Sequence, residues 1–221
     1  MRREFEEQLK EMQLKLIKMG SVCEEAIDLC VRMLHGEAEE GGGKLVSRFE
    51  FETDGLEREI ESICMKLLLL QQPVAKDLRA ISAALRMISD LERIGDQADD
   101  IAELAPHIAK GSHSKLHIDA MAKMASNMVT GSIDAYVKQD LDLARDIQKQ
   151  DDIVDGLFDK VKSELMVLLE KKAVSAEEAL DFIMAAKYFE RIADHAVNVA
   201  EWVEYSITGS HKKYDIKEGL Q

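Results

Sequence analysis

The sequence predicts an all-helical protein. Its 221 residues contain only two prolines, aromatic side chains make up 5% of the chain, and charged residues make up 33%. A composition rich in Ala, Leu, Met, Glu and Lys and poor in helix breakers favours long helices, whereas a β-rich fold would need more aromatic and β-branched residues. Hydrophobic residues make up 46% of the chain, which is enough for a packed core.

Six long helices are predicted, separated by glycine, proline and polar turns. The first carries apolar side chains at alternating spacings of three and four, from Leu9 to Met33, and ends at Gly36. Pro73 is expected in the first turn of the third helix, where a missing N–H costs no hydrogen bond. The remaining predicted helices cover approximately 44–71, 73–109, 117–138, 140–171 and 176–205, the last opened by a capping box at Ser175 and Glu178.

Two short motifs recur about a hundred residues apart. Asp54-Gly55-Leu56 returns as Asp155-Gly156-Leu157, and Glu92-Arg93-Ile94-Gly95-Asp96 returns as Glu190-Arg191-Ile192-Ala193-Asp194. Repetition of both motifs in the same order indicates a duplicated unit. The predicted organisation is two tandem antiparallel three-helix bundles, residues 1–110 and 111–208, followed by a polar C-terminal tail, 209–221.

Charge and cysteine usage restrict the partners and the compartment. The formal net charge of −14 repels phosphate backbones and anionic headgroups, so neither nucleic acid nor direct membrane insertion is expected. The longest apolar run, 67–70, is too short to span a bilayer, and the N-terminus lacks the apolar segment of a signal peptide. The three cysteines form no metal-binding pattern. A cytoplasmic location is predicted.

Four predicted helices each carry two acidic residues at a spacing of four. Three of these acids, Glu92, Asp151 and Glu190, fall on the apolar stripe of their helix. A spacing of four places both carboxylates on one helix face, where like charges destabilise the helix by roughly 0.2–0.5 kcal/mol. The pairs are Glu50 and Asp54, Glu92 and Asp96, Asp151 and Asp155, and Glu190 and Asp194.

Antiparallel packing brings these pairs together in each half. If the second and third helices turn near residue 72, facing residues have numbers that sum to about 145, as do those of Glu50 with Asp96 and Asp54 with Glu92. The fifth and sixth helices turn near residue 172, so the numbers of facing residues sum to about 345 there. Asp151 with Asp194 and Asp155 with Glu190 fulfil this condition. Two equivalent clusters of four carboxylates are therefore predicted.

Oxygen-only clusters suit hard cations such as magnesium, manganese, calcium or iron. Asp99, Asp100 and Asn198 lie one turn further along and are candidates for additional ligands. The alternative interpretation is a solvated acidic face whose charges are balanced by nearby cations, among them Arg93, Arg191 and Lys160.

At these residues the sequence resembles the PhoU family. The two Glu-Arg-Ile-x-Asp segments are similar to that family's Glu/Asp-xxx-Asp signature. The segment 67–79 is similar to the turn that precedes its third helix. The resemblance extends over nearly the whole chain. It departs at Ala173-Val174-Ser175, where the second half lacks the proline-led turn and the Asp-Leu-Arg element.

The resemblance implies a fold and a function. PhoU proteins are two three-helix bundles that bind multinuclear metal clusters at the acidic motifs, and they are often dimeric. By this likeness the eight acids would hold iron, zinc, magnesium or manganese. The chain would be a homodimeric regulator, not an enzyme, acting negatively between the ATPase of a phosphate ABC transporter and a sensor histidine kinase.

Two other functions remain open at this point. One is a carboxylate-bridged di-metal enzyme of the ferritin-like type, whose sites use a Glu-x-x-His motif. Position 95 is Gly and position 193 is Ala, where the two histidines would be required. The other is a structural helical adaptor without metal, in which the acids form ion pairs.

Overall fold

A computed structural model describes residues 2–37, 41–70, 73–108 and 117–210. These residues form six α-helices and no strand, which confirms the predicted all-α class and its duplicated helical organisation. The helices are α1 (Arg2–Leu34), α2 (Gly42–Leu70), α3 (Ala75–Ile108), α4 (Ile118–Lys138), α5 (Leu141–Glu170) and α6 (Ala176–Thr208).

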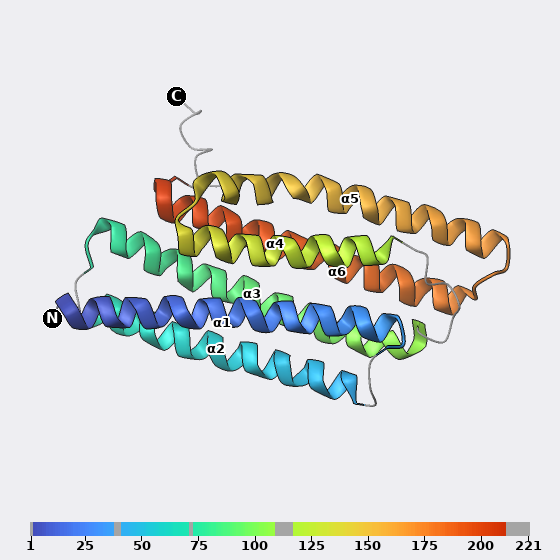
Figure 1. Cartoon of the computed structure of the whole chain (residues 1–221), viewed down its shortest axis with the longest axis horizontal. Coiled ribbons are helices and arrows are strands. Elements are labelled where there is room, and N and C mark those ends of the chain that lie inside the picture. The colour runs from blue at the N-terminus through green and yellow to red at the C-terminus, as the bar shows by residue number, and fades with distance from the viewer. Residues whose placement is uncertain (1, 38–40, 71–72, 109–116, 211–221) are drawn as a thin grey trace, which may run out of the picture.

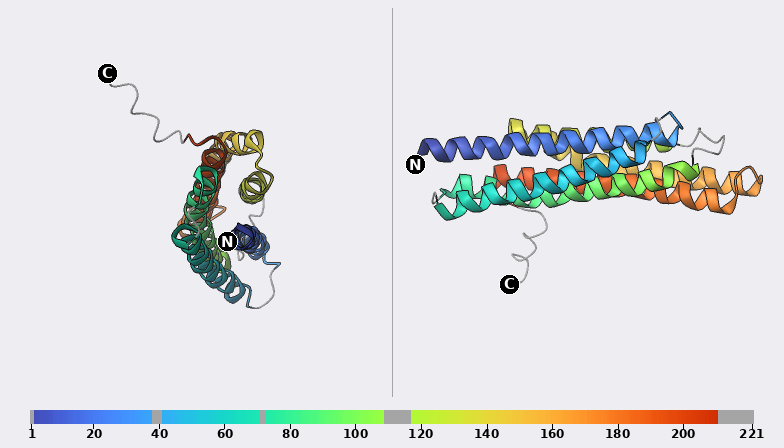
Figure 2. Two further views of the ribbon diagram at one scale, coloured as in Figure 1. Left: turned by 90° about the vertical axis from the view of Figure 1, so that its left-hand side faces the viewer. Right: turned by 90° about the horizontal axis from the view of Figure 1, so that it is seen from below.

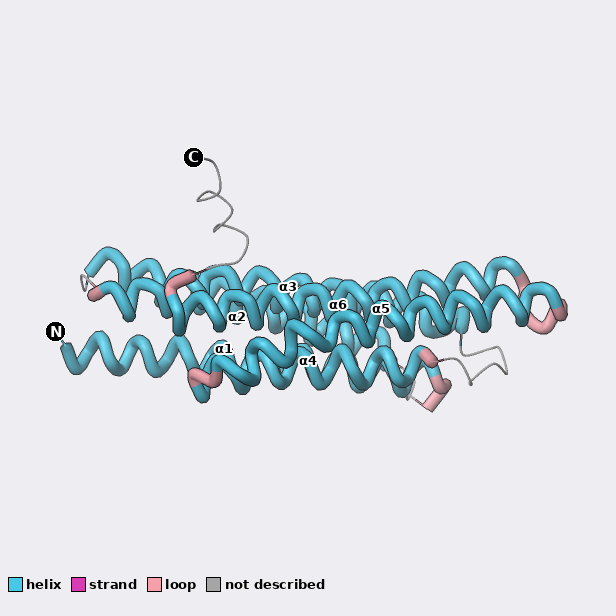
Figure 3. Tube along the Cα trace, turned by 90° about the horizontal axis from the view of Figure 1, so that it is seen from above, coloured by secondary structure: helices cyan, strands magenta, loops and turns pink. Residues whose placement is uncertain are grey.

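All six helices run along the long axis of an elongated molecule (Figures 1 and 3). The end-on view in Figure 2 shows α2, α3, α6 and α5 side by side in one curved layer, with α1 and α4 on its concave side. The contacts agree: α1 packs against α2 and α3, and α4 packs against α5 and α6. The most extensive contact joins α3 to α6, so the two halves meet along the middle of the layer.

The buried side chains form one continuous core that includes residues of all six helices. Methionine and alanine fill much of it, which explains how a chain with few aromatic residues packs. The three cysteines are buried and unpaired. The Cys23 and Cys30 thiols donate to the backbone carbonyls of Leu91 and Ala98 at 3.3 and 3.0 Å, which places these cysteines in the contact between α1 and α3.

Local capping explains several helix boundaries. The Asp140 side chain accepts from the backbone N–H of Leu143 at 3.0 Å and starts α5. The predicted capping box at Ser175 and Glu178 is present and starts α6. The placement of Pro73 inside the first turn of α3 was wrong. The helix begins at Ala75, so the proline precedes it.

The boundary between the two predicted bundles, at residues 110 and 111, and the tail from residue 211 onward lie outside the described residues. Helix α6 continues to Thr208, three residues beyond the predicted end, and Gly209 closes it in the left-handed conformation with φ 79°. Within the described ranges, no helix is long and apolar enough to cross a membrane.

Candidate metal centre

The first acidic cluster lies where α2 and α3 pack together. Glu50 is half-buried, and burial followed by the charges of Asp54, Asp99 and Asp96 raises the pKa of its carboxyl. Burial also raises the pKa of Glu92, with Asp96 as the next cause and Asp54 of the facing helix among the others. Carboxylates of α2 therefore act on carboxylates of α3, as the hairpin geometry predicts.

The two helices pack closely at this level. Thr53 is 1% exposed, and its hydroxyl donates to the backbone carbonyl of Glu50 at 2.7 Å. A Cβ atom at Gly95 would lie 2.6 Å from Thr53 Oγ1. Only glycine fits at position 95 without a shift of the helices, so the histidine that a ferritin-like site would need there cannot be accommodated.

The second cluster occupies the equivalent level between α5 and α6. Burial, Asp194 and Asp155, in that order, raise the pKa of Asp151 to about 6. Partial desolvation of its carboxyl and then Glu190 raise the pKa of Asp194, with Lys187 acting in the opposite direction. Asp155 and Asp194 are exposed, whereas Asp151 and Glu190 are half-buried. The acids therefore lie at the edge of the core rather than within it.

Basic side chains border the first cluster. Arg58 pairs with Asp54 at 2.9 Å, and Arg93 pairs with Asp96 at 3.1 Å and with Glu92 at 3.4 Å. Arg58 is 73% exposed and Arg93 is 60% exposed, so water screens both cations. These arginines neutralise part of the negative charge from the solvent side.

A lysine provides positive charge at the second cluster. Lys187, one turn before Glu190 on α6, forms an ion pair with it. Sequence reasoning named Arg93 correctly as a counterion but missed Lys187. It also proposed Arg191, whose guanidinium instead donates to the Gln97 side chain across the contact between α3 and α6 at 3.5 Å.

The carboxylates are neighbours rather than a preformed coordination sphere. Among the described residues, no group of three or more His, Cys, Asp or Glu side chains is arranged to hold a metal ion. Binding would require rotation of the acidic side chains toward a common point and displacement of the bordering cations. The donor set itself, carboxylate oxygens from two facing helices, has the chemistry that hard cations prefer.

The three additional candidates occupy different environments. Asp99 lies close to the first cluster, since it helps to raise the pKa of Glu50 and accepts from the Ser47 hydroxyl at 2.7 Å. Burial, Glu103 and Asp96 are the leading causes of a raised pKa at Asp100. Asn198 contacts α3. Its side-chain amide donates to Asp90 of α3 at 3.1 Å.

Asp90 forms a polar connection between the halves that the sequence did not reveal. Its Oδ1 also lies 2.9 Å from His195 Nδ1, and the His195 and Asp90 side chains are 24% and 17% exposed. His195 follows Asp194 in the second cluster, and Asp90 precedes Glu92 in the first by two residues. The spacing within either helix gives no signal of this contact, because it depends on the packing of α3 against α6.

Comparison with known proteins identifies the scaffold. The model of the PhoU domain matches the chain twice, over residues 16–105 and 118–203. The chain belongs to the PhoU family. The two matched regions correspond to the two helical halves, so the duplication seen in the sequence motifs is a duplication of the PhoU domain.

Relatives cover the chain almost from end to end. It is 34% identical over 220 residues to the "Phosphate-specific transport system accessory protein PhoU homolog" of Clostridium acetobutylicum, covering 98% of this chain and 99% of that protein. The Synechocystis protein with the same description is 35% identical over 210 residues, covering 94% and 93%.

The crystal structure of PhoU from Pseudomonas aeruginosa superposes with a TM-score of 0.85 at 30% identity, covering 93% of this chain and 100% of that one. The phosphate transport system regulatory protein PhoU of Streptococcus pneumoniae gives the same TM-score at 22% identity, covering 93% and 98%, and supports the fold.

Proposed function

We propose that this PhoU-family protein is a metal-binding regulatory adaptor in the cytoplasm, controlling phosphate uptake and phosphate-starvation signalling. It acts as a negative regulator between the ATPase of a phosphate ABC transporter and a sensor histidine kinase. The observation that carries this proposal is the placement of two carboxylate clusters at equivalent levels of a duplicated PhoU scaffold. The described homologues are accessory and regulatory proteins of phosphate transport, and a non-catalytic role is proposed for this chain too.

The acids are suited to metal because burial and mutual repulsion disfavour their ionised forms, and the neighbouring cations offset this only in part. Raised pKa values at Glu50, Glu92, Asp151 and Asp194 mean that ionising these groups together is unfavourable in the folded chain. A bound multivalent cation would supply positive charge and favour the ionised forms. Asp54 and Asp96 would complete the first ligand set, and Asp155 and Glu190 the second.

The ion pairs favour one competing interpretation, an adaptor without metal. Arg58, Arg93 and Lys187 already neutralise part of each cluster. Their long side chains are substantially exposed and can move aside at small cost. The ion pairs are therefore compatible with a metal-bound state, and metal analysis separates the two alternatives.

The regulatory proposal is tested in the organism that encodes the chain. Deleting its gene should raise phosphate uptake and a phosphate-starvation reporter in phosphate-replete medium, and the wild-type gene should restore repression. Glu92→Ala/Asp96→Ala should restore it poorly. Glu24→Ala/Glu25→Ala, which removes the same charge from exposed positions of α1, should restore it fully.

Two results would contradict the proposal. Unchanged uptake and reporter activity after gene deletion would remove the regulatory role. Full restoration by a variant lacking all four paired acids of α3 and α6 would remove the role of the clusters and leave an adaptor that works without metal.

A further inference from the structure

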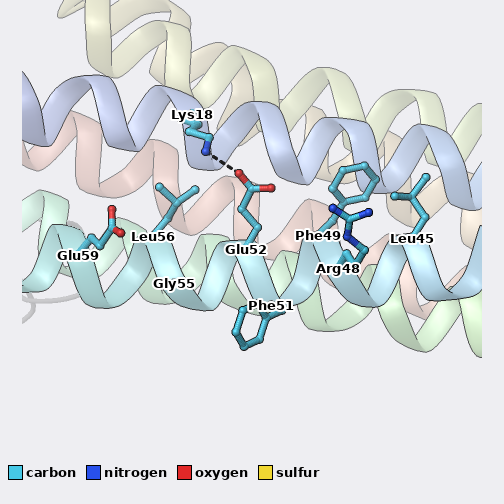
Figure 4. Close-up of a pocket in the computed structure, with 9 residues that line it drawn as sticks. All are labelled: Lys18, Leu45, Arg48, Phe49, Phe51, Glu52, Gly55, Leu56 and Glu59. Carbon is cyan, nitrogen blue, oxygen red and sulfur yellow. Dashed lines mark ion pairs between the residues drawn. The ribbon is translucent and has the colours of Figure 1, made fainter.

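A shallow groove of about 360 Å³ lies on the outer surface of α2 beside α1. Figure 4 shows Glu52 reaching toward Lys18 of α1, while Phe51 points away from α1 into solvent. Phe51 is 73% exposed and Leu45 is 39% exposed. Burial of apolar surface on binding is favourable, so the exposed ring is available to stabilise a contact with another molecule.

The second half of the chain shows that folding does not require these apolar residues. At the equivalent positions of α5, 101 residues later, Asp146 replaces Leu45 and Asp152 replaces Phe51. Both aspartates are exposed. The same helical scaffold therefore forms with acidic residues at these two places, so the fold does not require the apolar pair of the first half.

Gly55 lines the groove and has no side chain to fill it. A Cβ atom there would meet no other atom within 4 Å, so nothing in the chain itself requires glycine. Glycine inside a helix is less stable than alanine. Gly156 occupies the equivalent position of α5 and is equally open. The glycine is a feature of the repeat, and only in the first half does it adjoin Phe51.

The charges along the groove define what can bind. Lys18 pairs with Glu52 and Lys15 pairs with Glu59, each at 2.6 Å. Arg48, which lines the same groove, forms no ion pair with any residue of the described ranges. Within the described part of the chain it is therefore a cation without a counterion, on a protein whose net charge is −14. A carboxylate on the bound molecule would complement it.

We propose that this groove binds an amphipathic helix of a partner protein that carries a bulky apolar residue and a carboxylate. The apolar side chain packs on Phe51 and over Gly55, and the carboxylate faces Arg48. A helix fits because the helices that form the groove satisfy their backbone groups internally and offer no edge to an added strand. Arg48 and Gly55 are seven residues apart, about 10 Å along the helix, so the two partner residues lie about two turns apart.

A display library of helix-forming peptides, varied on one face, is selected for binding to the full chain in the presence of EDTA. Selected peptides should combine Leu, Met or Phe with Glu or Asp two turns away. Labelled peptides, measured by fluorescence anisotropy, should bind Phe51→Asp and Arg48→Glu at least tenfold more weakly than wild type. Exchanging the peptide's acid for lysine should weaken binding to wild type and restore it to Arg48→Glu.

Ile153→Asp is the matched control, since Ile153 is 49% exposed on the equivalent surface of α5, and it should bind as wild type does. Thermal unfolding confirms that each variant folds, as Asp152 leads us to expect for Phe51→Asp. Failure to select any peptide, or equal binding by Phe51→Asp and wild type, would overturn the proposal. So would a dimer of the purified chain that Phe51→Asp dissociates, because the occupant would then be a second copy. Absence of metal from the acidic clusters would leave this proposal unaffected.

Discussion

Replacing Asp151 by asparagine should stabilise the metal-free protein at pH 8. In the folded chain the pKa of Asp151 is raised from an ordinary value of 3.8 to about 6, by burial and by the charges of Asp194 and Asp155. One pKa unit corresponds to about 1.36 kcal/mol, so the full shift is equivalent to about 3 kcal/mol. Because the side chain is only half-buried and solvent screens it, we expect a gain of about 1–2 kcal/mol.

The gain should depend on pH in one direction. A carboxyl whose pKa is higher in the folded state takes up a proton on folding, so wild-type stability falls as the pH rises from about 4 to about 6. Above pH 6 the folded protein carries the cost of the buried charge and of its repulsion by neighbouring acids, and the neutral asparagine removes both. Near pH 4 the aspartic acid is itself protonated when folded, and the two proteins should have nearly equal stability.

Urea unfolding followed by circular dichroism, in EDTA and between pH 4 and pH 8, measures this difference. Asp152→Asn is the matched control, because Asp152 is the exposed neighbour and removes the same charge. It should change the free energy of unfolding by less than about 0.5 kcal/mol. Equal stability of Asp151→Asn and wild type at pH 8, or an equal gain at pH 4 and pH 8, would refute the electrostatic reasoning.

Two further predictions concern packing and capping. Gly95→Ala should lower the free energy of unfolding by about 1–3 kcal/mol, because the added methyl group meets the buried Thr53 side chain. Gly55→Ala should raise it by about 0.5–1 kcal/mol. Thermal unfolding of the two variants measures both changes, and destabilisation by both or by neither would contradict the packing argument. Ser175→Ala removes the side-chain acceptor for the backbone N–H of Glu178 and should cost about 0.5–2 kcal/mol in urea unfolding, while an unchanged midpoint would show that the capping box contributes little.

Periodicity and repetition were sufficient to predict the six helices and their duplication. The apolar stripes identify each helix because one face of it must be buried. The convergence of Glu50 with Asp96 also followed from the sequence, since short turns force consecutive helices to pack antiparallel. Local signals such as Ser175 with Glu178 located a boundary to within a residue.

Contacts between elements distant in sequence were not predictable in this way. The connection from Asp90 to His195 and Asn198 depends on α3 packing against α6, and no short turn relates these two helices. The ion pair of Lys187 with Glu190 is a different case, because a spacing of three on one helix makes the two side chains neighbours. It could have been predicted from the sequence, and it was not. Phe51 could be recognised only from the structure, which shows its ring exposed to solvent where the second half carries the exposed Asp152.

Elemental analysis of the purified protein tests the central claim most directly. Wild type should be compared with Glu92→Ala/Asp96→Ala and with Glu190→Ala/Asp194→Ala, each confirmed to be folded. We predict metal in the wild type and partial loss in each variant, because each half should bind its metal independently. Absence of metal from wild type after exposure to iron, zinc, manganese or magnesium, or the same metal content in all three proteins, would contradict the account and favour an adaptor whose acids are balanced by Arg58, Arg93 and Lys187.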